Sequence, residues 1–335
     1  MLSYLVRRLV QFAGTLLAAS LVVFLALEFL PGDAAQVLLG TEASADTLAA
    51  LREQLGLDRP AAGRYLEWLA GFATGDLGTS HIYGVPIAGM LGDRLAISLP
   101  LALIAFALST AIAIPLGILA ATHRGGPGDW AVIGFAQIGL AVPNFWFAIL
   151  LILVFAVHLG LFASGGFPGW EGGIGPALRA LVLPAAALAL SEAAILSRVT
   201  RSAMLETLGQ DYIRTARAKG LSRGRILFGH ALRNAMIPVA TILGLQFAFL
   251  VMGAVIVENV FYLPGLGRLL LQSIFQRDLV VVRDLVVLLS GFVILVNLLV
   301  DLAYAAIDPR PRAGVQDGAA HGAAHDGFAH DGAAA

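Results

Sequence analysis

The chain has 335 residues, of which 59% are hydrophobic and only 13% are charged, so too few polar residues are available to cover a soluble globule of this size. This composition indicates an integral membrane protein. The formal net charge is −1, which provides no overall attraction for nucleic acid. The chain contains no cysteine, which excludes disulfides, thiolate catalysis and cysteine metal sites.

Six apolar segments are long enough to cross a membrane. Crossing the hydrocarbon core takes about 20 apolar residues in a helix, because lipid offers no hydrogen-bond partners to the backbone. The six segments are Leu9–Leu30, Ile97–Thr122, Trp130–Val157, Leu181–Val199, Ala235–Val257 and Leu285–Ala306. The first is too long for the apolar region of a cleaved signal peptide, so it is expected to remain as an anchor. Pro143 and Asn144 are expected to interrupt the third segment.

The distribution of basic residues predicts the orientation. An even number of spans places both termini on one side of the membrane. That side carries thirteen Lys and Arg residues, eight of them between Arg198 and Arg233, whereas the opposite side carries eight in far more sequence. Short loops rich in Lys and Arg are retained in the cytoplasm. Both termini are therefore expected to be cytoplasmic.

The long connection after the first span contains two short patterns of helical period. The first follows Asp46, a predicted N-cap, and stops at Gly56. The second begins near Pro60 and places Trp68 within an aromatic stripe. We expect these helices to pack as a small cap on the bundle or to lie at the membrane interface, and contact with a delivering partner is the alternative role.

The basic segment Arg198–Asn234 reads RVTRSAMLETLGQDYIRTARAKGLSRGRILFGHALRN. Gly220 can adopt the left-handed conformation that ends a helix, and Ser222 can cap the next one. One apolar stripe predicts the first helix, and its members are Leu205, Leu208 and Tyr212. Charge alone is explained by cytoplasmic retention and contact with anionic lipid. Helix stops and caps favour a second role, because a protein-docking element must present a rigid shape.

Motifs of a known family cover roughly residues 1–312. They include YLVRRLVQ near the N-terminus, LPGD after the first span, GDLGTS, DYIRTARAKGLS, HALRNAMIPV, ENVFYLPGLGRLL and YAAIDPRPR. With these motifs the sequence resembles the inner-membrane permease subunits of binding-protein-dependent ABC importers, in the dipeptide, oligopeptide and nickel branch. That superfamily carries E-A-A, three residues and Gly in a cytoplasmic loop, then I-x-L-P. Here Arg214-Thr215-Ala216, Gly220 and Leu232-Arg233 stand at those positions, so the Glu and the Pro of the general consensus are both replaced by Arg.

The resemblance implies a fold, a function and partners. The fold is that of a type I ABC importer permease, and the function is transport of dipeptides or oligopeptides across a bacterial or archaeal cytoplasmic membrane by alternating access. Nickel and glutathione are alternative cargoes. The implied partners are a homologous second permease, two ABC ATPase subunits that bind ATP and Mg, and an extracytoplasmic binding protein, with membrane lipid around the spans. No cofactor, metal site or enzymatic activity is expected in this chain.

The resemblance also divides the chain and locates its coupling residues. Residues 1–96 would form the first helix and the extracytoplasmic cap segment, and residues 97–312 a five-helix core with the coupling loop at 198–234. Residues 313–335 form a low-complexity tail that is expected to be disordered. The residues implied in contact with an ATPase are Asp211, Tyr212, Arg214, Thr215, Ala216, Arg217, Lys219, Gly220 and Ser222.

Three chemical motifs in the chain could indicate a different function. The only lysine, Lys219, precedes a glycine rather than Ser or Thr, so the chain has no P-loop and ATP must be hydrolysed elsewhere. Gly220–Gly224 matches G-x-S-x-G, but a hydrolase elbow follows a strand, and here the motif joins helices. Histidines of the tail could bind a divalent metal weakly, although tail composition explains them as well.

Embedded polar residues bear on the transport mechanism. An ion-coupled carrier, the rival function, needs carboxylates near the middle of the membrane. Glu28, Glu258 and Asp301 lie toward span ends and only Glu192 is embedded, which argues against ion coupling. The residues predicted to line a translocation pathway are Asn144, Glu192 and Gln246.

Overall fold

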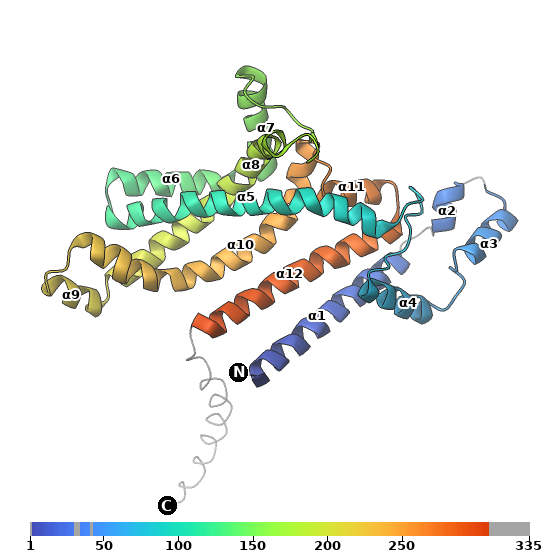
Figure 1. Ribbon diagram of the computed structural model, residues 1–335, viewed down its shortest axis with the longest axis horizontal. Coiled ribbons are helices and arrows are strands. Elements are labelled where there is room, and N and C mark those ends of the chain that lie inside the picture. The colour runs from blue at the N-terminus through green and yellow to red at the C-terminus, as the bar shows by residue number, and fades with distance from the viewer. Residues whose placement is uncertain (1, 30–33, 41–42, 308–335) are drawn as a thin grey trace, which may run out of the picture.

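The computed structural model describes residues 2–29, 34–40 and 43–307, and this part of the chain is built from helices and their connections (Figure 1). The helices of the first half are α1 (Leu2–Glu28), α2 (Ala34–Leu39), α3 (Ala45–Gln54), α4 (Ala61–Thr74), α5 (Ile87–Thr122), α6 (Pro127–Ala141), α7 (Asn144–Leu151) and the π-helix η1 (Ile152–His158). The second half contains α8 (Ile174–Leu208), α9 (Asp211–Ala218), the π-helix η2 (Arg225–Ala231), α10 (Leu232–Val260), α11 (Leu266–Phe275) and α12 (Leu279–Ile307). The all-α fold expected from the sequence is confirmed.

Five stretches of helix are individually long and apolar enough to span a membrane, and a bent pair makes six when it is counted as one span. The five are α1, α5, α8, η2 joined to α10, and α12, within the described residues. The bent pair joins α6 to α7 and η1 at an angle of 102°. Several helices start earlier than their predicted spans, as α5 does at Ile87 rather than Ile97. Hydropathy marks only the apolar stretch, whereas the hydrogen-bonded helix continues into polar flanks.

The predicted interruption of the third span is confirmed at Pro143. Val142 is extended, with φ −96° and ψ 123°, because the ring of a following proline disfavours the helical region. Proline also lacks the N–H that would continue the helical ladder. The chain then resumes a helix at Asn144, and the N–H groups of Trp146 and Phe147 donate to the carbonyl of Pro143. The break is thus a local consequence of one residue.

Helix α8 lies at the centre of the bundle, packed against α5, α6, α7 and α10. Many of its side chains are enclosed, and Leu181 and Leu196 are fully buried. Small residues let the neighbouring helices approach closely. A Cβ atom added to Gly139 of α6 would lie 2.4 Å from the Cβ of Ala194, and one added to Gly117 of α5 would lie 2.5 Å from the Cβ of Thr200. Neither glycine can be enlarged without moving a helix.

Helices α1 and α12 run side by side, and α4 packs across one end of this pair (Figure 1). The aromatic stripe predicted for the second short helix is confirmed, because Trp68 stacks on Phe24 of α1 with ring centroids 6.2 Å apart. The indole N–H of Trp68 also donates to Asp284 of α12 at 2.7 Å. These contacts fasten α4 to two membrane-spanning helices.

Helix α3 corrects one detail of the sequence analysis. Its N-cap is Ser44, whose hydroxyl accepts a hydrogen bond from the N–H of Thr47 at 3.3 Å. Asp46, the predicted cap, lies inside the first turn, where its carboxylate complements the positive end of the helix dipole. Serine and aspartate are both good caps, and pattern alone could not choose between positions two residues apart.

Candidate coupling site and membrane pathway

A short separate helix follows α8 at one end of the bundle (Figure 1). α8 ends at Leu208, Gly209 and Gln210 turn the chain, and α9 begins at Asp211. The sequence analysis was wrong to place Leu208 and Tyr212 on one continuous helix. Gly209 has low helix propensity and Gln210 has extended backbone angles, φ −71° and ψ 150°, so the helix is interrupted between Leu208 and Asp211. The apolar period nevertheless continues across this break.

Two inward residues hold α9 in place. Ile213 is fully buried and Ala216 is 8% exposed, and both belong to a core cluster that includes Met204 and Ile226. Their spacing of three residues places them on the same face of the helix. The other predicted coupling residues are exposed, and they are Asp211, Tyr212, Arg214, Thr215, Arg217, Lys219, Gly220 and Ser222. α9 therefore rests on one narrow apolar edge and presents most of its surface outward.

The C-terminus of α9 is closed by a specific backbone motif. Gly220 has φ +77°, and its N–H donates to the carbonyl of Arg217 at 2.9 Å. The N–H of Leu221 reaches back to the carbonyl of Ala216 at 3.3 Å, which completes a Schellman motif. The carbonyl of Ser222 accepts from the N–H of Ile226 as the next helical segment begins. The predicted helix stop at Gly220 is confirmed.

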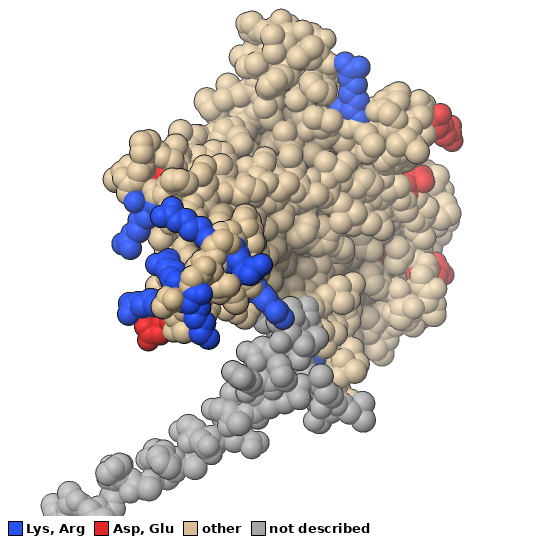
Figure 2. Space-filling model, turned by 60° about the vertical axis from the view of Figure 1, so that its left-hand side comes forward, with Lys and Arg blue, Asp and Glu red and all other residues tan. Residues whose placement is uncertain are grey.

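Basic side chains gather around α9 (Figure 2). Exposed members of this group are Arg214, Arg217, Lys219, Arg223 and Arg225. Arg214 lies 3.2 Å from Asp211 on the preceding turn, and both side chains are largely exposed, so this ion pair contributes little to folding. The result is a rigid and strongly positive surface at one end of the bundle.

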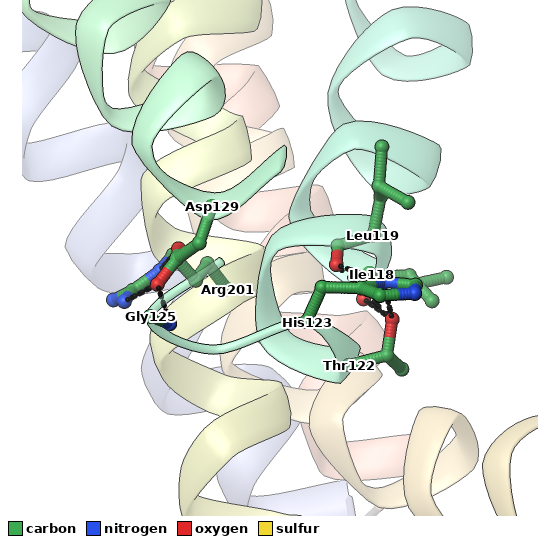
Figure 3. A network of polar contacts seen from close by, with 7 residues as sticks. All are labelled: Ile118, Leu119, Thr122, His123, Gly125, Asp129 and Arg201. Atoms are coloured by element: carbon green, nitrogen blue, oxygen red, sulfur yellow. Dashed lines mark hydrogen bonds and ion pairs between the residues drawn. The ribbon is translucent and has the colours of Figure 1, made fainter. Parts of the chain in front are cut away.

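One half-buried basic residue of this region serves the fold through an ion pair with a buried aspartate. Arg201 of α8 donates to both oxygens of Asp129 at the start of α6, with its Nη2 2.8 Å from Oδ2 (Figure 3). The same Oδ2 accepts the N–H of Gly125 at 2.9 Å. The α5–α6 turn is thereby tied to α8. Sequence reasoning missed this pair because its partners are 72 residues apart.

The three predicted pathway residues lie around α8, and two of them are joined directly. The amide Nε2 of Gln246 in α10 donates to the backbone carbonyl of Glu192 at 2.8 Å. Asn144, the first residue of α7, accepts a hydrogen bond from the hydroxyl of Ser191. Ser191 was not among the predicted residues, because a lone serine in an alanine-rich span gives no signal. The structure thus connects α7, α8 and α10 through polar groups inside the membrane-spanning region.

Sequence reasoning also missed the structural role of a buried carboxylate at the other end of the bundle. Glu258, near the end of α10, is fully buried and accepts the N–H of Gly267 at 2.8 Å and of Arg268 at 3.2 Å. The hydroxyl of Ser98 donates to the same carboxylate and accepts the N–H of Leu266 at 2.8 Å. Its place near a span end was predicted correctly, but its complete enclosure depends on tertiary contacts.

Metal binding finds no support in the described part of the chain. Residues 2–29, 34–40 and 43–307 contain no group of three or more His, Asp and Glu side chains that could hold a metal ion. The histidines singled out in the sequence, His321, His325 and His330, lie outside the described residues.

The fold and the site together define a polytopic helical membrane protein that presents a rigid basic helix between two spans. The chain belongs to the family of binding-protein-dependent transport system inner membrane components, whose model matches residues 113–313, and the N-terminal model of the same component matches residues 1–102. It is therefore a permease subunit of such a system.

Two relatives and one solved structure illustrate the match. The oligopeptide transport system permease protein AppB of Bacillus subtilis (strain 168) is 40% identical over 313 residues, covering 92% of this chain and 99% of the relative. The dipeptide transport system permease protein DppB of Escherichia coli (strain K12) is 39% identical over 336 residues, covering 93% and 99%. The fold is similar to a crystal structure of an amino acid ABC transporter with histidines, with a TM-score of 0.50, 15% identity and coverage of 65% of this chain and 94% of that chain.

Proposed function

We propose that this chain is one of two membrane-spanning subunits of an ATP-driven importer that moves dipeptides or oligopeptides across the cytoplasmic membrane of a bacterium or archaeon. This chain aligns with almost the whole length of AppB and DppB. Their names, oligopeptide and dipeptide transport system permease proteins, support a peptide cargo over nickel or glutathione. The observation that carries the transport mechanism is α9, a short helix with a closed C-terminus and an exposed surface.

The shape of α9 suits the transmission of force from a separate ATPase. Its exposed residues, from Asp211 to Ser222, would sit in a groove of an ATPase subunit, while Ile213 and Ala216 stay in the core of this chain. When the ATPases close, α9 would move with them and carry α8 along. The spans would then change between inward-open and outward-open arrangements as rigid bodies. ATP and Mg would bind to the ATPase subunits, and no covalent step would occur in this chain.

Charge supports an orientation with α9 and both termini in the cytoplasm. The basic surface around α9 is the largest cluster of Lys and Arg in the sequence, and such clusters are retained on the cytoplasmic side. α4 and the other short helices before α5 would then lie outside, where the binding protein delivers its cargo. Residues 1–96 would form this first part and residues 97–312 the permease core.

Co-purification tests the assembly directly. The chain is extracted from its native membrane in mild detergent, and the proteins that elute with it are identified by mass. We expect two P-loop ATPase chains, a second homologous permease and, under gentle conditions, the extracytoplasmic binding protein. Recovery of this chain alone, or only as a homo-oligomer, would contradict the proposal.

Uptake into proteoliposomes tests the cargo. The purified assembly, with its binding protein outside and ATP inside, is offered dialanine, trialanine, nickel or glutathione. We expect ATP-dependent accumulation of at least one peptide and no effect of an ionophore. Accumulation that needs no ATP and collapses with the ionophore would replace the importer by an ion-coupled carrier.

A further inference from the structure

A cavity of about 330 Å³ lies between the α1–α12 pair and the rest of the bundle, and side chains of α1, α4, α5, α10, α11 and α12 line it. Ser98 is the only polar side chain among the described residues that line this cavity. Its hydroxyl is already used twice, because it donates to Glu258 and accepts the N–H of Leu266. The cavity therefore offers apolar surface and almost no hydrogen bonding.

This lining suits a hydrocarbon chain and does not suit a peptide. Each peptide unit carries an N–H donor and a C=O acceptor, and burying these groups without partners is costly. A hydrocarbon chain has no such groups. An apolar cavity of about 150 Å³ holds one benzene ring, so the present cavity, about twice as large, has room for roughly twelve carbons.

The cavity occupies the depth of one leaflet of the membrane. Its lining residues on α12 run from Val287 to Leu295, which is about 12 Å along the helix and close to half of the roughly 30 Å hydrocarbon core. On α5 the lining begins at Leu95. The neighbouring Ala96 accepts the indole N–H of Trp170 at 3.1 Å, and tryptophan is enriched where hydrocarbon meets the lipid headgroups. The cavity thus runs from the membrane interface toward the middle of the bilayer.

A positive charge lies at the interface end of the cavity. Arg94 precedes Ser98 by four residues on the same face of α5, and no charged residue follows it in this helix. Its side chain is partly buried, and its charge acts on the buried carboxylate of Glu258, whose hydrogen bonds come from other groups. In the described part of the chain, the guanidinium of Arg94 forms no hydrogen bond and no ion pair. Its N–H groups can therefore bind a phosphate.

We infer that this cavity binds one acyl chain of a membrane phospholipid, whose phosphate group is held by Arg94. The cavity supplies room for hydrocarbon and the guanidinium supplies the complementary charge. Leu95 is adjacent to Arg94, so the chain enters the cavity beside the phosphate. The lipid fills the space that the α1–α12 pair leaves against α5 and α10, because α1 packs mainly on α12. This inference goes beyond the proposed transport function and does not depend on the cargo.

Lipid titration of the whole transporter tests the site. The assembly is extracted from its native membrane, stripped of lipid with detergent, and titrated with palmitoyl-oleoyl phosphatidylglycerol or with the corresponding diacylglycerol, which has the same chains and no phosphate. Bound lipid is counted by native mass spectrometry. We expect saturable binding of phosphatidylglycerol at a concentration at least tenfold below that needed for further lipids, and weaker binding of diacylglycerol.

Two kinds of variant separate the phosphate contact from the cavity. Arg94→Gln should weaken the binding of phosphatidylglycerol at least tenfold and leave the binding of diacylglycerol unchanged. Leu99→Trp on α5 and Val251→Phe on α10 each place a larger side chain in the cavity. Both of these variants should weaken the binding of both lipids at least tenfold, and a merely structural role of Arg94 would not distinguish the two lipids.

Matched controls make the result specific. Arg59→Gln removes a positive charge from an exposed position in the connection before α4. Leu103→Trp enlarges a side chain of α5 that is 47% exposed and lies outside the cavity lining. Both controls should leave the saturable binding unchanged. Each variant is first compared with the native transporter in thermal unfolding, so that a loss of fold is recognised as such.

Several outcomes would overturn the inference. Phosphatidylglycerol binding that survives Arg94→Gln would remove the phosphate from the site, and binding that survives both cavity-filling variants would remove the chain from the cavity. A photoreactive residue at Leu95 that crosslinks, in native membranes, to the second permease or to a transported peptide instead of to lipid would assign the cavity to that partner. The proposed function fails separately, because it predicts ATP-driven peptide uptake by the native assembly whether or not this cavity holds a lipid.

Discussion

Two short helices link long spans at opposite ends of the bundle (Figure 1), and they are held in opposite ways. α9 connects α8 to η2 and α10 and is anchored by Ile213 and Ala216, while its charged surface stays exposed. α11 connects α10 to α12 and sinks into the bundle, with Leu266 and Leu269 almost fully enclosed. The two helices are similar in length, so the difference lies in what surrounds them.

The anchoring of α11 depends on side chains from distant parts of the chain. The carboxylate of Glu258 binds two N–H groups at the start of α11, and a Cβ atom added to Gly265 would lie 2.3 Å from the same carboxyl group. α9 is anchored only by Ile213 and Ala216, and its C-terminus is closed by the backbone conformation at Gly220. The N–H groups at the start of α11 therefore find their hydrogen-bond acceptor within the chain, whereas α9 leaves its outer surface available for a second protein.

Removing the anchor of α11 should have the largest effect on the protein. Glu258→Ala leaves the buried N–H of Gly267 without an acceptor, at a cost of about 1–3 kcal/mol, and also removes the acceptor of the partly buried N–H of Arg268. We expect a marked fall in the amount of folded protein in the membrane and in the thermal unfolding midpoint. Glu258→Gln keeps an acceptor oxygen and should be milder. Equal stability of the Ala variant and the native chain would contradict this anchoring.

Altering the end of α9 should abolish transport while leaving folding intact. Gly220→Val places a β-branched residue at φ +77°, which strains the backbone by about 1–3 kcal/mol and opens the Schellman motif. We expect peptide uptake to fall more than tenfold at an unchanged amount of protein in the membrane.

Gly220→Asn is the matched control, because asparagine tolerates the left-handed region and a Cβ atom at Gly220 meets nothing within 4 Å. Uptake by this variant should stay near the native level. If the Val variant transports normally, α9 does not need its present geometry and the coupling assignment fails.

Removing one exposed charge from α9 should weaken the binding of the ATPase subunits without changing the stability of the chain. Arg214→Ala breaks only an exposed ion pair with Asp211, so the free energy of unfolding should change by less than about 0.5 kcal/mol. Recovery of the ATPase subunits during purification should nevertheless decrease. Arg59→Ala, which breaks an exposed pair with Glu67, is the control and should affect neither quantity. Undiminished ATPase recovery with Arg214→Ala would remove this residue from the interface.

The smallest effect concerns pH at the α11 end. Burial lowers the pKa of His81, Asp278 raises it and Arg283 lowers it further, so the net shift is downward. The unfolded chain then takes up a proton below about pH 6.5 while the folded chain resists it, and stability falls as the pH drops through this range. We expect the unfolding midpoint to decrease between about pH 7 and pH 5. His81→Gln should reduce this decrease, and an identical pH profile in the variant would exclude His81 as its source.

Local features were predictable from the sequence, and they include much of the coupling element. The stop at Gly220 and the break at Pro143 depend on the conformational limits of single residues. The break between α8 and α9 was not predicted, because Leu205, Leu208 and Tyr212 keep a helical period across Gly209 and Gln210. A periodic pattern records which face is apolar, and it does not record whether the backbone stays continuous.

Tertiary contacts account for what the sequence did not reveal. Ser98 and Glu258 are 160 residues apart, and Trp68 and Asp284 are 216 residues apart. Hydropathy treats such residues as isolated polar positions in apolar spans. Asn144, Glu192 and Gln246 were selected one by one as embedded polar residues, and only the fold shows that Gln246 donates to Glu192 and that Ser191 donates to Asn144.

The glycine contacts of α8 have a mechanical consequence. At Gly117 and Gly139, the helices α5 and α6 touch α8 so closely that they cannot slide past it without a collision. The stretch of α8 from Ala194 to Leu208, about 21 Å long, is therefore held by both neighbouring helices, and we expect it to move together with them as one rigid unit. If α9 is displaced by a bound ATPase, the displacement would enter α8 at Leu208 and reach Ala194 through this stretch.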